Sequence, residues 1–379
     1  MDISNKTFVV VGTGKSGVAA AELLLRHAKK VYLYDGNEAL DVAAFRKQHQ
    51  SLEAVELILG TLPAEIETTL DIAVLSPGVP LDIPVVEQMK AQGICIWGEI
   101  ELAYVLGKGK VVAITGTNGK TTTTTLVGQI MARHFAKVQV VGNIGIPYTS
   151  VVEDTTEDSV VVAEISSFQL ETIQTFAPKA AAILNITPDH LNRHHTMENY
   201  IAAKESIVKN QSKEDICVLN YNDEVLRDFG KTLEQNVIYF SSTEVLEEGL
   251  YLDGNEIMWA RNGGREAIIS VEELHILGAH NYENAMAAIA LCDGMGVPMQ
   301  TICDGLRAFH AVEHRIEFVC KKNDIAFYND SKGTNPDAAI KGICAMNRKT
   351  VLIGGGYDKE STYDEWIDSF HGKVKKLIL

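Results

Sequence analysis

Residues 111–122, VVAITGTNGKTT, join a run of β-branched and small apolar residues to a loop with two glycines, a lysine and two hydroxyls. The apolar run predicts a buried parallel strand, and the glycines let backbone N–H groups turn toward a polyphosphate at the start of a following helix. Lys120 would then reach the outer phosphates and Thr121 a Mg²⁺ ion. The common phosphate loop has its first glycine five positions earlier than the second, but Ile114 stands there and the nearest earlier glycine is Gly116. The stretch therefore predicts a nucleotide-binding unit of an unusual type.

Composition limits the class of protein. A chain of 379 residues suggests two or three domains, and its net charge of −16 argues against a general nucleic-acid or anionic-membrane surface. The start of the chain has no basic and apolar leader, and no apolar run approaches membrane-spanning length. The cysteines form no C-x-x-C pair, so we expect reduced thiols in a cytoplasmic protein. These cysteines are Cys95, Cys217, Cys292, Cys303, Cys320 and Cys344.

Apolar runs alternate with helical patterns along most of the chain, which predicts βαβ units and parallel sheets covered by helices. Two glycine-rich turns predict two nucleotide-type sheets. The fold class is therefore α/β, with a Rossmann-like sheet at residues 1–98, a central phosphate-loop domain at 99–311, and part of a third α/β domain at 312–379. Short antiparallel structure is expected between Ser241 and Ser270. The predicted strands are 8–11, 31–34, 72–75, 111–115, 138–141, 160–164, 180–186, 216–219, 326–329, 351–353 and 376–379.

The first sheet opens with GTGKSG at residues 12–17, after a valine run, and Asp35 ends the next strand. This pattern is the dinucleotide fingerprint with its ribose-binding acid. Taken alone it favours an NAD enzyme, and a tight strand-to-helix turn without a ligand is the alternative. A further turn, SPGVP at residues 76–80, is expected at the same edge of the sheet.

Polar residues also follow the strands of the second sheet. Asn143 lies in GNIG, Glu164 ends a strand before SSFQL, and His190 lies in TPDHLNRH. A carboxylate at a strand end beside a phosphate loop is a natural Mg²⁺ ligand, and an imidazole beside it can take a metal position. Lys204 is expected on a helix packed behind this edge. Without the loop, an exposed glutamate, a structural histidine and a solvated lysine would be the ordinary interpretations.

The later segments add further polar groups. Asn281 and Asn284 share one helix face and suit adenine or ribose recognition, with helix capping as the alternative. Arg315 in VEHRIE and Lys332 in NDSKGTNP could complete a phosphate site, with surface ion pairing as the alternative.

Ten motifs in order resemble the Mur ligases, and together they cover nearly the whole chain: GTGKSG, SPGV, ITGTNGKTT, GNIG, EISSFQLE, TPDHLNRH, YIAAK, GAHNYENA, VEHRIEF and NDSKGTNPDA. They are most similar to the branch that adds D-glutamate to UDP-N-acetylmuramoyl-L-alanine. The resemblance implies an ATP-dependent amide-bond ligase of peptidoglycan precursor synthesis, working through an acyl phosphate. It also implies a cytoplasmic monomer that binds neither nucleic acid nor membrane.

The same resemblance assigns roles to residues. It implies that Lys204 is carbamylated and binds the second of two Mg²⁺ ions, and that Thr334 lies near the reacting groups. The implied catalytic residues are Lys120, Glu164, His190, Lys204 and Lys332, and the implied metal ligands are Thr121, Glu164, His190 and Lys204. The implied ATP site comprises Gly116, Thr117, Asn118, Gly119, Lys120, Thr121, Thr122, Asn281, Asn284, Arg315 and Asp330. The implied UDP-substrate site comprises Thr13, Gly14, Lys15, Ser16, Asp35, Gly36, Gly78, Asn143 and His190.

The chain departs from the family at Asn192, His195 and Gly333, where Asp, Gly and Ala are expected, and none of these changes removes a charged ligand. Residues 312–379 are fewer than the about 100 that an open α/β domain usually needs. We expect the glutamate-recognising segment to lie beyond Leu379. A non-catalytic fragment that binds ATP and the UDP-sugar is therefore one alternative. A folylpolyglutamate synthetase-like ligase is another, but it should lack the N-terminal sheet.

Overall fold

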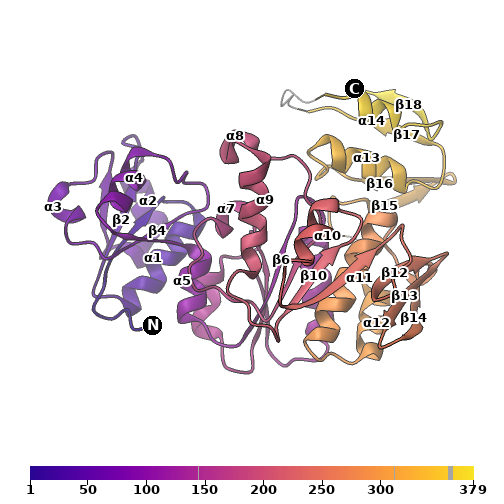
Figure 1. The fold of residues 1–379 in the computed structure, drawn as a ribbon. Helices are drawn as coiled ribbons and strands as arrows, with labels where there is room; N and C mark the ends of the chain where they lie inside the picture. The colour runs from indigo at the N-terminus through magenta and orange to yellow at the C-terminus, as the bar shows by residue number, and fades with distance from the viewer. Residues whose placement is uncertain (144, 311, 357–361) are drawn as a thin grey trace. The chain divides into compact units, whose positions relative to one another are not determined.

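The computed structural model describes residues 1–143, 145–310, 312–356 and 362–379, so the predicted boundary at Ala311 lies outside the described residues. The described chain forms two compact units (Figure 1). The first unit comprises Met1–Thr115, Lys137–Lys179 and His190–Gln211, and the second comprises Gly116–Ala136, Ala180–Asp189 and Ser212–Leu379. The domain bounds given above stay a prediction.

The first unit begins with a sheet of five parallel strands in the order β3-β2-β1-β4-β5. Strands β1 and β4 are made almost wholly of buried apolar residues, as expected for strands covered on both faces. The strand order reverses between β1 and β4, and ligands of such sheets bind at the carboxyl ends of the strands there. The strands are β1 (Thr7–Val11), β2 (Lys30–Asp35), β3 (Glu56–Leu59), β4 (Ile72–Leu75) and β5 (Cys95–Gly98).

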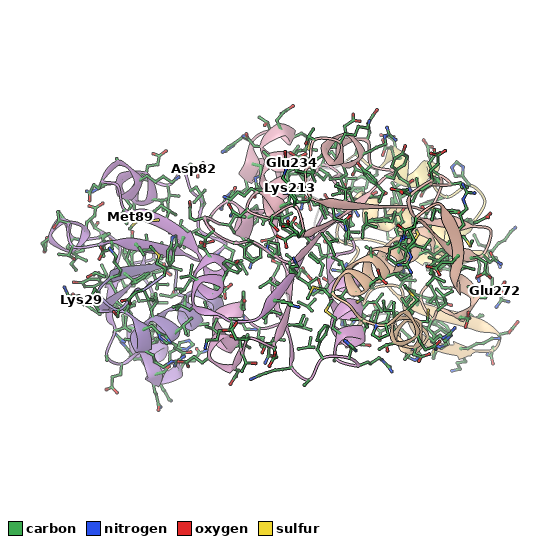
Figure 2. The ribbon with its side chains drawn as sticks, turned by 60° about the horizontal axis from the view of Figure 1, so that its bottom comes forward. Lys29, Asp82, Met89, Lys213, Glu234 and Glu272 are labelled. Atoms are coloured by element: carbon green, nitrogen blue, oxygen red, sulfur yellow. The ribbon has the colours of Figure 1, made fainter. Side chains whose placement is uncertain are left out.

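Helices cover this sheet. Helix α1 turns a face of small and apolar residues, among them Ala20 and Ala21, toward the core, so that its backbone can approach the strands closely. Met89 of α4 is fully buried in a second cluster with Val9 and Leu75 (Figure 2). The elements are α1 (Lys15–His27), α2 (Val42–Gln48), η1 (Gln50–Leu52), α3 (Ala64–Glu67), α4 (Pro84–Ala91) and α5 (Glu99–Leu106).

Three further parallel strands of the first unit lie in the order β7-β8-β6. Strand β8 is buried along its whole length, and Glu164 at its end is buried with it. The strands are β6 (Lys110–Thr115), β7 (Val138–Gly142) and β8 (Val160–Glu164). The helical segments are η2 (Tyr148–Asp154), α7 (Ser167–Leu170), α8 (Leu191–His194), α9 (Met197–Glu205) and η3 (Ser206–Val208).

The second unit contains six strands in the order β9-β10-β11-β12-β13-β14. Strands β9 to β12 are parallel, and β13 and β14 continue the sheet antiparallel, which confirms the expected insertion between Ser241 and Ser270. The strands are β9 (Ala180–Ile183), β10 (Ile216–Asn220), β11 (Asn236–Ser241), β12 (Gly249–Asp253), β13 (Glu256–Arg261) and β14 (Gly264–Ser270). The helical segments are α6 (Lys120–Met131), α10 (Glu224–Gly230), η4 (Val271–Glu273), α11 (Ala279–Gly294) and α12 (Met299–Ala308).

Residues 312–379 form two separate two-stranded sheets within the second unit. Several apolar side chains here stay exposed, including Phe318, Phe327 and Ile353. The elements are β15 (Glu317–Lys322), β16 (Ile325–Asn329), α13 (Pro336–Ala345), β17 (Thr350–Ile353), α14 (Asp364–Asp368) and β18 (Val374–Ile378). Within the described ranges, no helix has both the length and the apolar character needed to cross a membrane.

Candidate functional site

The predicted phosphate loop connects β6 to α6 and contains two glycines in the left-handed region, with φ of +146° at Gly116 and +86° at Gly119. Such conformations strongly favour glycine and turn backbone N–H groups to one side. Lys120, the first residue of α6, donates from Nζ to the carbonyl oxygens of Gly116 and Thr117, at 2.8 Å each. The lysine therefore lies across the loop that it is predicted to serve.

Two pairs of reciprocal hydrogen bonds hold the loop against the segment that follows β9. Asn118 donates its backbone N–H to Asn185 Oδ1 at 2.8 Å, and Asn185 Nδ2 donates back to the Asn118 carbonyl at 3.0 Å. The Thr117 hydroxyl accepts from Thr187 N and donates to the Thr187 carbonyl. Asn185 and Thr187 make these contacts. Strand β9 ends at Ile183, so the expected strand to Ile186 is too long.

The two predicted asparagines of α11 lie beside the loop. Asn284 is buried, and its Oδ1 accepts from the Thr123 hydroxyl at 3.2 Å. A Cβ at Gly119 would come within 2.4 Å of that oxygen, so only glycine allows the approach. Asn284 Nδ2 donates to Asn281 Oδ1 at 3.1 Å, while Asn281 Nδ2 donates to the Leu277 carbonyl at 2.8 Å. The pair is thus held rigidly at one helix face, and Asn281 also satisfies a carbonyl before the helix begins.

The last segment brings several charged residues to the same loop. Arg315 Nη2 donates to the Thr121 hydroxyl at 3.1 Å, and Asn118 Nδ2 donates to Asp337 Oδ2 at 2.5 Å. Asp330 accepts from the Ile316 N–H at 3.1 Å, and burial raises the pKa of its carboxyl. Lys332 is exposed. Asp337 was not predicted as a site residue, because a single acidic residue after a proline at the start of a helix is typical of ordinary helix capping.

The GTGKSG turn of the first unit has the geometry of the fingerprint. Gly12 has φ of +102°, and a Cβ on Gly17 would lie 1.9 Å from the Gly12 carbonyl, so α1 can begin this close to β1 only with glycine there. Asp35 Oδ2 accepts from both the N–H and the hydroxyl of Thr13, at 2.9 and 2.6 Å. Although burial opposes ionisation, these hydrogen bonds leave the pKa of the Asp35 carboxyl lowered. Asp35 is therefore already engaged in shaping the turn.

Other residues of the predicted UDP-substrate site lie at the ends of strands in the same unit. Lys15 Nζ donates to the Gly145 carbonyl at 2.6 Å, which joins the first turn to the GNIG loop. Gly14, Gly36 and Gly78 are exposed. Ser16 is half-buried in the first turn of α1. Ile144 of the GNIG loop lies outside the described residues.

Glu164 is 1% exposed, and its two carboxylate oxygens differ. Oε1 accepts from Asn143 Nδ2 at 2.8 Å, whereas Oε2 has no hydrogen-bond partner among the described residues. A buried carboxylate oxygen without a donor is costly unless a cation approaches it. Carboxylate oxygens are the ligands that Mg²⁺ prefers, so this side chain fits a magnesium site. The described residues contain no group of three or more His, Cys, Asp or Glu side chains placed to hold a metal ion.

His190 and Lys204 lie on the two sides of an aromatic group. His190 is exposed, precedes α8 with φ of +53°, and packs edge-on against Phe168 with ring centroids 4.9 Å apart. Lys204 is 2% exposed, and its ammonium lies 4.6 Å from the centre of the Tyr200 ring. A lysine this buried is not the solvated surface residue that composition alone suggests, because burial of an ammonium is costly without compensation.

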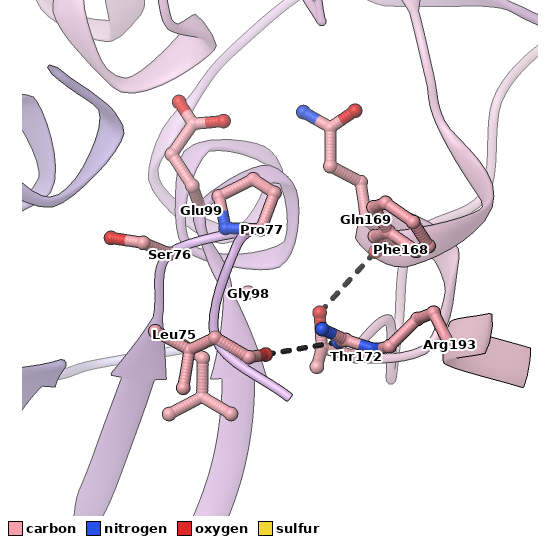
Figure 3. A pocket seen from close by; sticks show the side chains of 10 residues that line it. Leu75, Ser76, Pro77, Gly98, Glu99, Phe168, Gln169, Thr172 and Arg193 are labelled. Carbon is pink, nitrogen blue, oxygen red and sulfur yellow. Dashed lines mark hydrogen bonds between the residues drawn. The ribbon is translucent and has the colours of Figure 1, made fainter. Parts of the chain in front are cut away.

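A half-buried ion pair that the sequence did not predict lies nearby. Glu171 accepts from Arg193 Nη2 at 2.9 Å, and Arg193 also donates to the Val79 carbonyl of the SPGVP turn at 2.9 Å. A small pocket of about 10 Å³, room for one water, opens beside Arg193 and Phe168 (Figure 3). Each residue belongs to a quoted motif, but only the fold shows that the motifs meet. The pocket is lined by Leu75, Ser76, Pro77, Val79, Gly98, Glu99, Phe168, Gln169, Thr172 and Arg193.

The predicted catalytic residues are divided between the two units. Lys120 and Lys332 belong to the second unit, and Glu164, His190 and Lys204 belong to the first. Their joint action is part of the proposal below.

Comparisons with known proteins identify the fold and the family. Residues 6–98 match the model described as Mur ligase MurD-like, N-terminal domain, and residues 114–292 match the Mur ligase middle domain. Two relatives are both called UDP-N-acetylmuramoylalanine--D-glutamate ligase. The protein from Lachnoclostridium phytofermentans is 53% identical over 380 residues, which covers 100% of this chain and 84% of the relative. The protein from Lachnospira eligens is 52% identical over 379 residues, with the same coverage.

Among solved structures, MurF ligase from Thermotoga maritima in complex with ADP superposes with a TM-score of 0.58 at 17% identity, covering 100% of this chain and 85% of that one. At this identity the likeness shows the multidomain α/β fold alone. The family follows from the sequence relatives, which match along the whole of this chain. This chain belongs to the Mur ligase family.

Proposed function

We propose that this chain is an ATP-dependent ligase that joins D-glutamate to UDP-N-acetylmuramoyl-L-alanine, an amide-forming step of peptidoglycan precursor synthesis. The observation that carries the proposal is the 53% identity to a relative named for this activity, over 100% of the chain. The ADP in the Thermotoga relative's structure supports a nucleotide in the fold. The free state of all six cysteines is consistent with a reducing cytoplasm, and we expect the chain to work as a monomer.

In the proposed reaction, the γ-phosphoryl of ATP passes to the substrate carboxylate, and the amine of D-glutamate displaces phosphate from the acyl phosphate. Lys120 and the backbone N–H groups of residues 116–122 would hold the phosphates and neutralise charge on the moving phosphoryl. Arg315 is suited to the same task, because its guanidinium already reaches the Thr121 hydroxyl. Asn281, Asn284 and Asp330 would complete the ATP site, with Lys332 and Thr334 near the reacting groups.

Glu164 would be the principal ligand of the cation site, because its buried Oε2 accepts no hydrogen bond from the residues that the structure describes. Thr121, His190 and Lys204, the last as its carbamate, would complete the coordination of two Mg²⁺ ions. Bound Mg²⁺ supplies electrostatic stabilisation of phosphoryl oxygens. Lys204 is 2% exposed and lies beside the Tyr200 ring, and we assign its carbamate to the second Mg²⁺ ion.

The UDP portion would bind at the switch point of the first sheet. The turn after β1 and the turn after β4 meet there, because Ser76 donates its backbone N–H to the Val11 carbonyl at 3.0 Å. Thr13, Gly14, Lys15, Ser16, Asp35, Gly36, Gly78, Asn143 and His190 are the residues we assign to this substrate.

Phosphate release tests the proposal. The chain is mixed with ATP, Mg²⁺ and UDP-N-acetylmuramoyl-L-alanine, with D-glutamate, with L-glutamate or with neither, and the Lachnoclostridium relative serves as the positive control. We expect release that depends on D-glutamate and falls by more than about 100-fold in Lys120→Ala, as removal of a charge-stabilising group costs in related chemistry. Turnover with another amino acid, or none with D-glutamate while the relative is active, would contradict the proposal.

A separate experiment tests the modification of Lys204. We expect ¹³C-bicarbonate to give a carbamate signal in the unaltered chain that is missing from Lys204→Arg. Lys209→Arg is the control, since that lysine is bonded to the Ile173 carbonyl at 2.6 Å and has no assigned role. An equal carbamate signal in the unaltered chain and in Lys204→Arg would rule out this lysine.

A further inference from the structure

His194 occupies the centre of a buried group of side chains to which no role has been given above. The histidine is 4% exposed. Its ring stacks on Phe168 with centroids 5.3 Å apart and planes at 24°, and its other neighbour is the Tyr200 ring at 5.2 Å. We call Ser167, Phe168, Glu171, His194 and Tyr200 the His194 cluster.

Both ring nitrogens of His194 have partners in the cluster. Nε2 lies 2.9 Å from the Ser167 hydroxyl oxygen, and Nδ1 lies 3.3 Å from Glu171 Oε1. Because burial lowers the pKa of His194 to about 4, the ring is neutral at pH 7 and carries one N–H. Glu171 can only accept, so we assign that proton to Nδ1 and let the Ser167 hydroxyl donate to Nε2. The hydrogen bond to Ser167 and the nearby Glu171 carboxylate favour one rotation of the ring.

The cluster lies between His190 and Lys204, two of the three predicted metal ligands of the first unit. On one side Phe168 packs against His190, with ring centroids 4.9 Å apart. On the other side Tyr200 lies under the Lys204 ammonium at 4.6 Å. His194 is the ring that separates and spaces Phe168 and Tyr200, so a rotation of His194 would be transmitted to both.

An apolar side chain would fill this space at less cost. Burial of a polar ring costs free energy unless polar partners face its nitrogens, and here one of the two partners is the Glu171 carboxylate, which also accepts from Arg193 at 2.9 Å. Because burial of the polar His194 ring costs free energy, we infer that this position serves to orient its neighbours rather than only to fill space.

We propose that His194 is a positioning residue, which through Phe168 and Tyr200 sets the orientation of His190 and Lys204 for cation binding. The inference rests on the proposed function, because it takes those two residues as parts of a metal site. His194 itself would touch neither cation nor substrate.

Two substitutions of His194 distinguish the contribution of ring stacking from that of the polar contacts. His194→Phe keeps a flat ring between Phe168 and Tyr200 but loses the hydrogen bond to Ser167 and the polar contact with Glu171. His194→Gln keeps a polar group but loses the stack. The matched control is His195→Gln, since the side chain of that neighbour is 64% exposed and lies 3.4 Å from Asp82 Oδ2. Ser167→Ala removes one bond from the full-length chain and leaves the ring in place.

The readouts are Mn²⁺ affinity by electron paramagnetic resonance, the ¹³C-carbamate signal, and kcat and KM. We expect His194→Phe to bind Mn²⁺ about tenfold more weakly, the lower end of what loss of a ligand's supporting partner costs. Ser167→Ala should lose less, and His195→Gln nothing. We expect kcat to fall while KM for the UDP-substrate changes by less than about twofold.

Unchanged Mn²⁺ affinity and carbamate signal in both His194→Phe and Ser167→Ala would overturn the inference. Should His194→Phe fail to fold, Ser167→Ala decides the same point. Absence of D-glutamate-dependent turnover in the unaltered chain, with normal Mn²⁺ binding that His194→Phe weakens, would instead overturn the proposed function and leave the positioning role standing. Absence of Mn²⁺ binding in the unaltered chain would overturn the inference, because there would be no cation site to orient.

Discussion

Gly17 lies where the first turn of α1 passes over the end of β1. A Cβ at this position would stand 1.9 Å from the Gly12 carbonyl, and a backbone oxygen cannot move aside as a side chain would. We expect Gly17→Ala to destabilise the chain by about 2 to 3 kcal/mol, the range of overpacking in a close-packed interior. Thermal unfolding followed by circular dichroism measures the effect.

Gly14 is the control for this change. It is three residues away in the same turn, with extended backbone, and a Cβ there would meet nothing within 4 Å. We expect Gly14→Ala to change the melting temperature by no more than about 2 °C, since surface substitutions stay within about 0.5 kcal/mol. Equal losses in both variants would mean that the close approach of α1 to β1 is not the constraint.

His194 makes the free energy of unfolding depend on pH, and the burial of its ring decides the sign of that dependence. Desolvation lowers the pKa of His194 from 6.5 to about 4 in the folded state. Between these values the unfolded chain holds a proton that the folded chain lacks, so the free energy of unfolding falls as the pH falls through this window. The contribution is at most about 1.4 kcal/mol per pH unit and ends below about pH 4.

Urea unfolding at pH 7, 6 and 5 measures this dependence. His194→Gln is less stable than the unaltered chain at pH 7, and we expect the gap to narrow toward pH 5, because only the unaltered chain loses the His194 contribution. His280, whose pKa burial also lowers to about 4, remains in both chains and cancels in the comparison. An imidazole of His194 that titrates near pH 6.5 by NMR would contradict the prediction.

For single residues, the sequence predicts which side chains belong to a site better than it predicts which of them are buried or in contact. The loop glycines, Lys120 and Asn284 follow from residue type and spacing, because only certain side chains permit a left-handed turn or a close approach. The burial of Lys204 could not be read from YIAAK alone, where a lysine at the end of a helical pattern looks solvated. Likewise, nothing in TPDHLNRH distinguishes buried His194 from exposed His195, because their difference arises from the rings that pack on one and not the other.

Asp223 caps the N-terminus of helix α10, and the same carboxylate also binds the segment that follows β9. Oδ1 accepts from the N–H groups of Val225 and Leu226 at 3.1 and 3.3 Å, and Oδ2 accepts from the N–H of buried Ile186 at 2.7 Å. We expect Asp223→Ala to cost about 1 kcal/mol for the lost cap and a further ~1 to 3 kcal/mol for the stranded Ile186 N–H. The urea midpoint should fall with an unchanged slope.

Asp41 provides the comparison, because it caps the exposed start of α2 with a single bond to Ala44 N at 2.9 Å. We expect Asp41→Ala to cost only the cap, about 1 kcal/mol. Asp223→Asn should recover part of the loss, since an amide oxygen can still accept. If Asp223→Ala cost no more than Asp41→Ala, the bond to Ile186 would contribute nothing.

Element prediction succeeds where the pattern is continuous. The buried valine and isoleucine runs of β1, β4, β6 and β8 are visible because parallel strands need apolar residues on both faces. Strands β3, β5 and β11 were not predicted, because they are short or carry polar residues among apolar ones, and pairing with a neighbour decides them. The end of β9 was misplaced for a similar reason, since Asn185, which lies within the expected strand, bonds the phosphate loop.

The distribution of thiols tests the packing of the whole molecule. Cys95, Cys320 and Cys344 are exposed, while Cys217 and Cys292 are fully buried, and burial raises the pKa of both buried thiols. Buried thiols are unreactive because the thiolate is the nucleophile. We therefore expect Ellman's reagent to label the exposed three rapidly and the buried two only after unfolding.

Mass spectrometry of the labelled chain identifies which cysteines react. Cys303, 6% exposed and bonded to the Ile268 carbonyl, should follow the buried group. Rapid labelling of Cys217 or Cys292 in the folded chain would show that the sheet of the second unit opens readily.

At the scale of the molecule, the sequence predicts two nucleotide-type sheets because each has its own glycine turn after an apolar strand. Residue types and spacing do not decide which ligand each turn binds, since GTGKSG with Asp35 fits NAD as well as a uridine diphosphate. The extent of each compact unit is also hidden, because segments far apart in the chain, such as Lys137–Lys179 and His190–Gln211, join the first unit through contacts that no local pattern records.

The ammonium of Lys120 rests on two carbonyl oxygens of its own loop. A lysine side chain carries about 2 kcal/mol of rotamer entropy, and much of that freedom is already lost in the folded chain. An arriving triphosphate would meet a cation that is in place, and would exchange two bonds to neutral acceptors for shorter charge-assisted ones. The loss of side-chain freedom at this lysine is thus largely a cost of folding rather than of association.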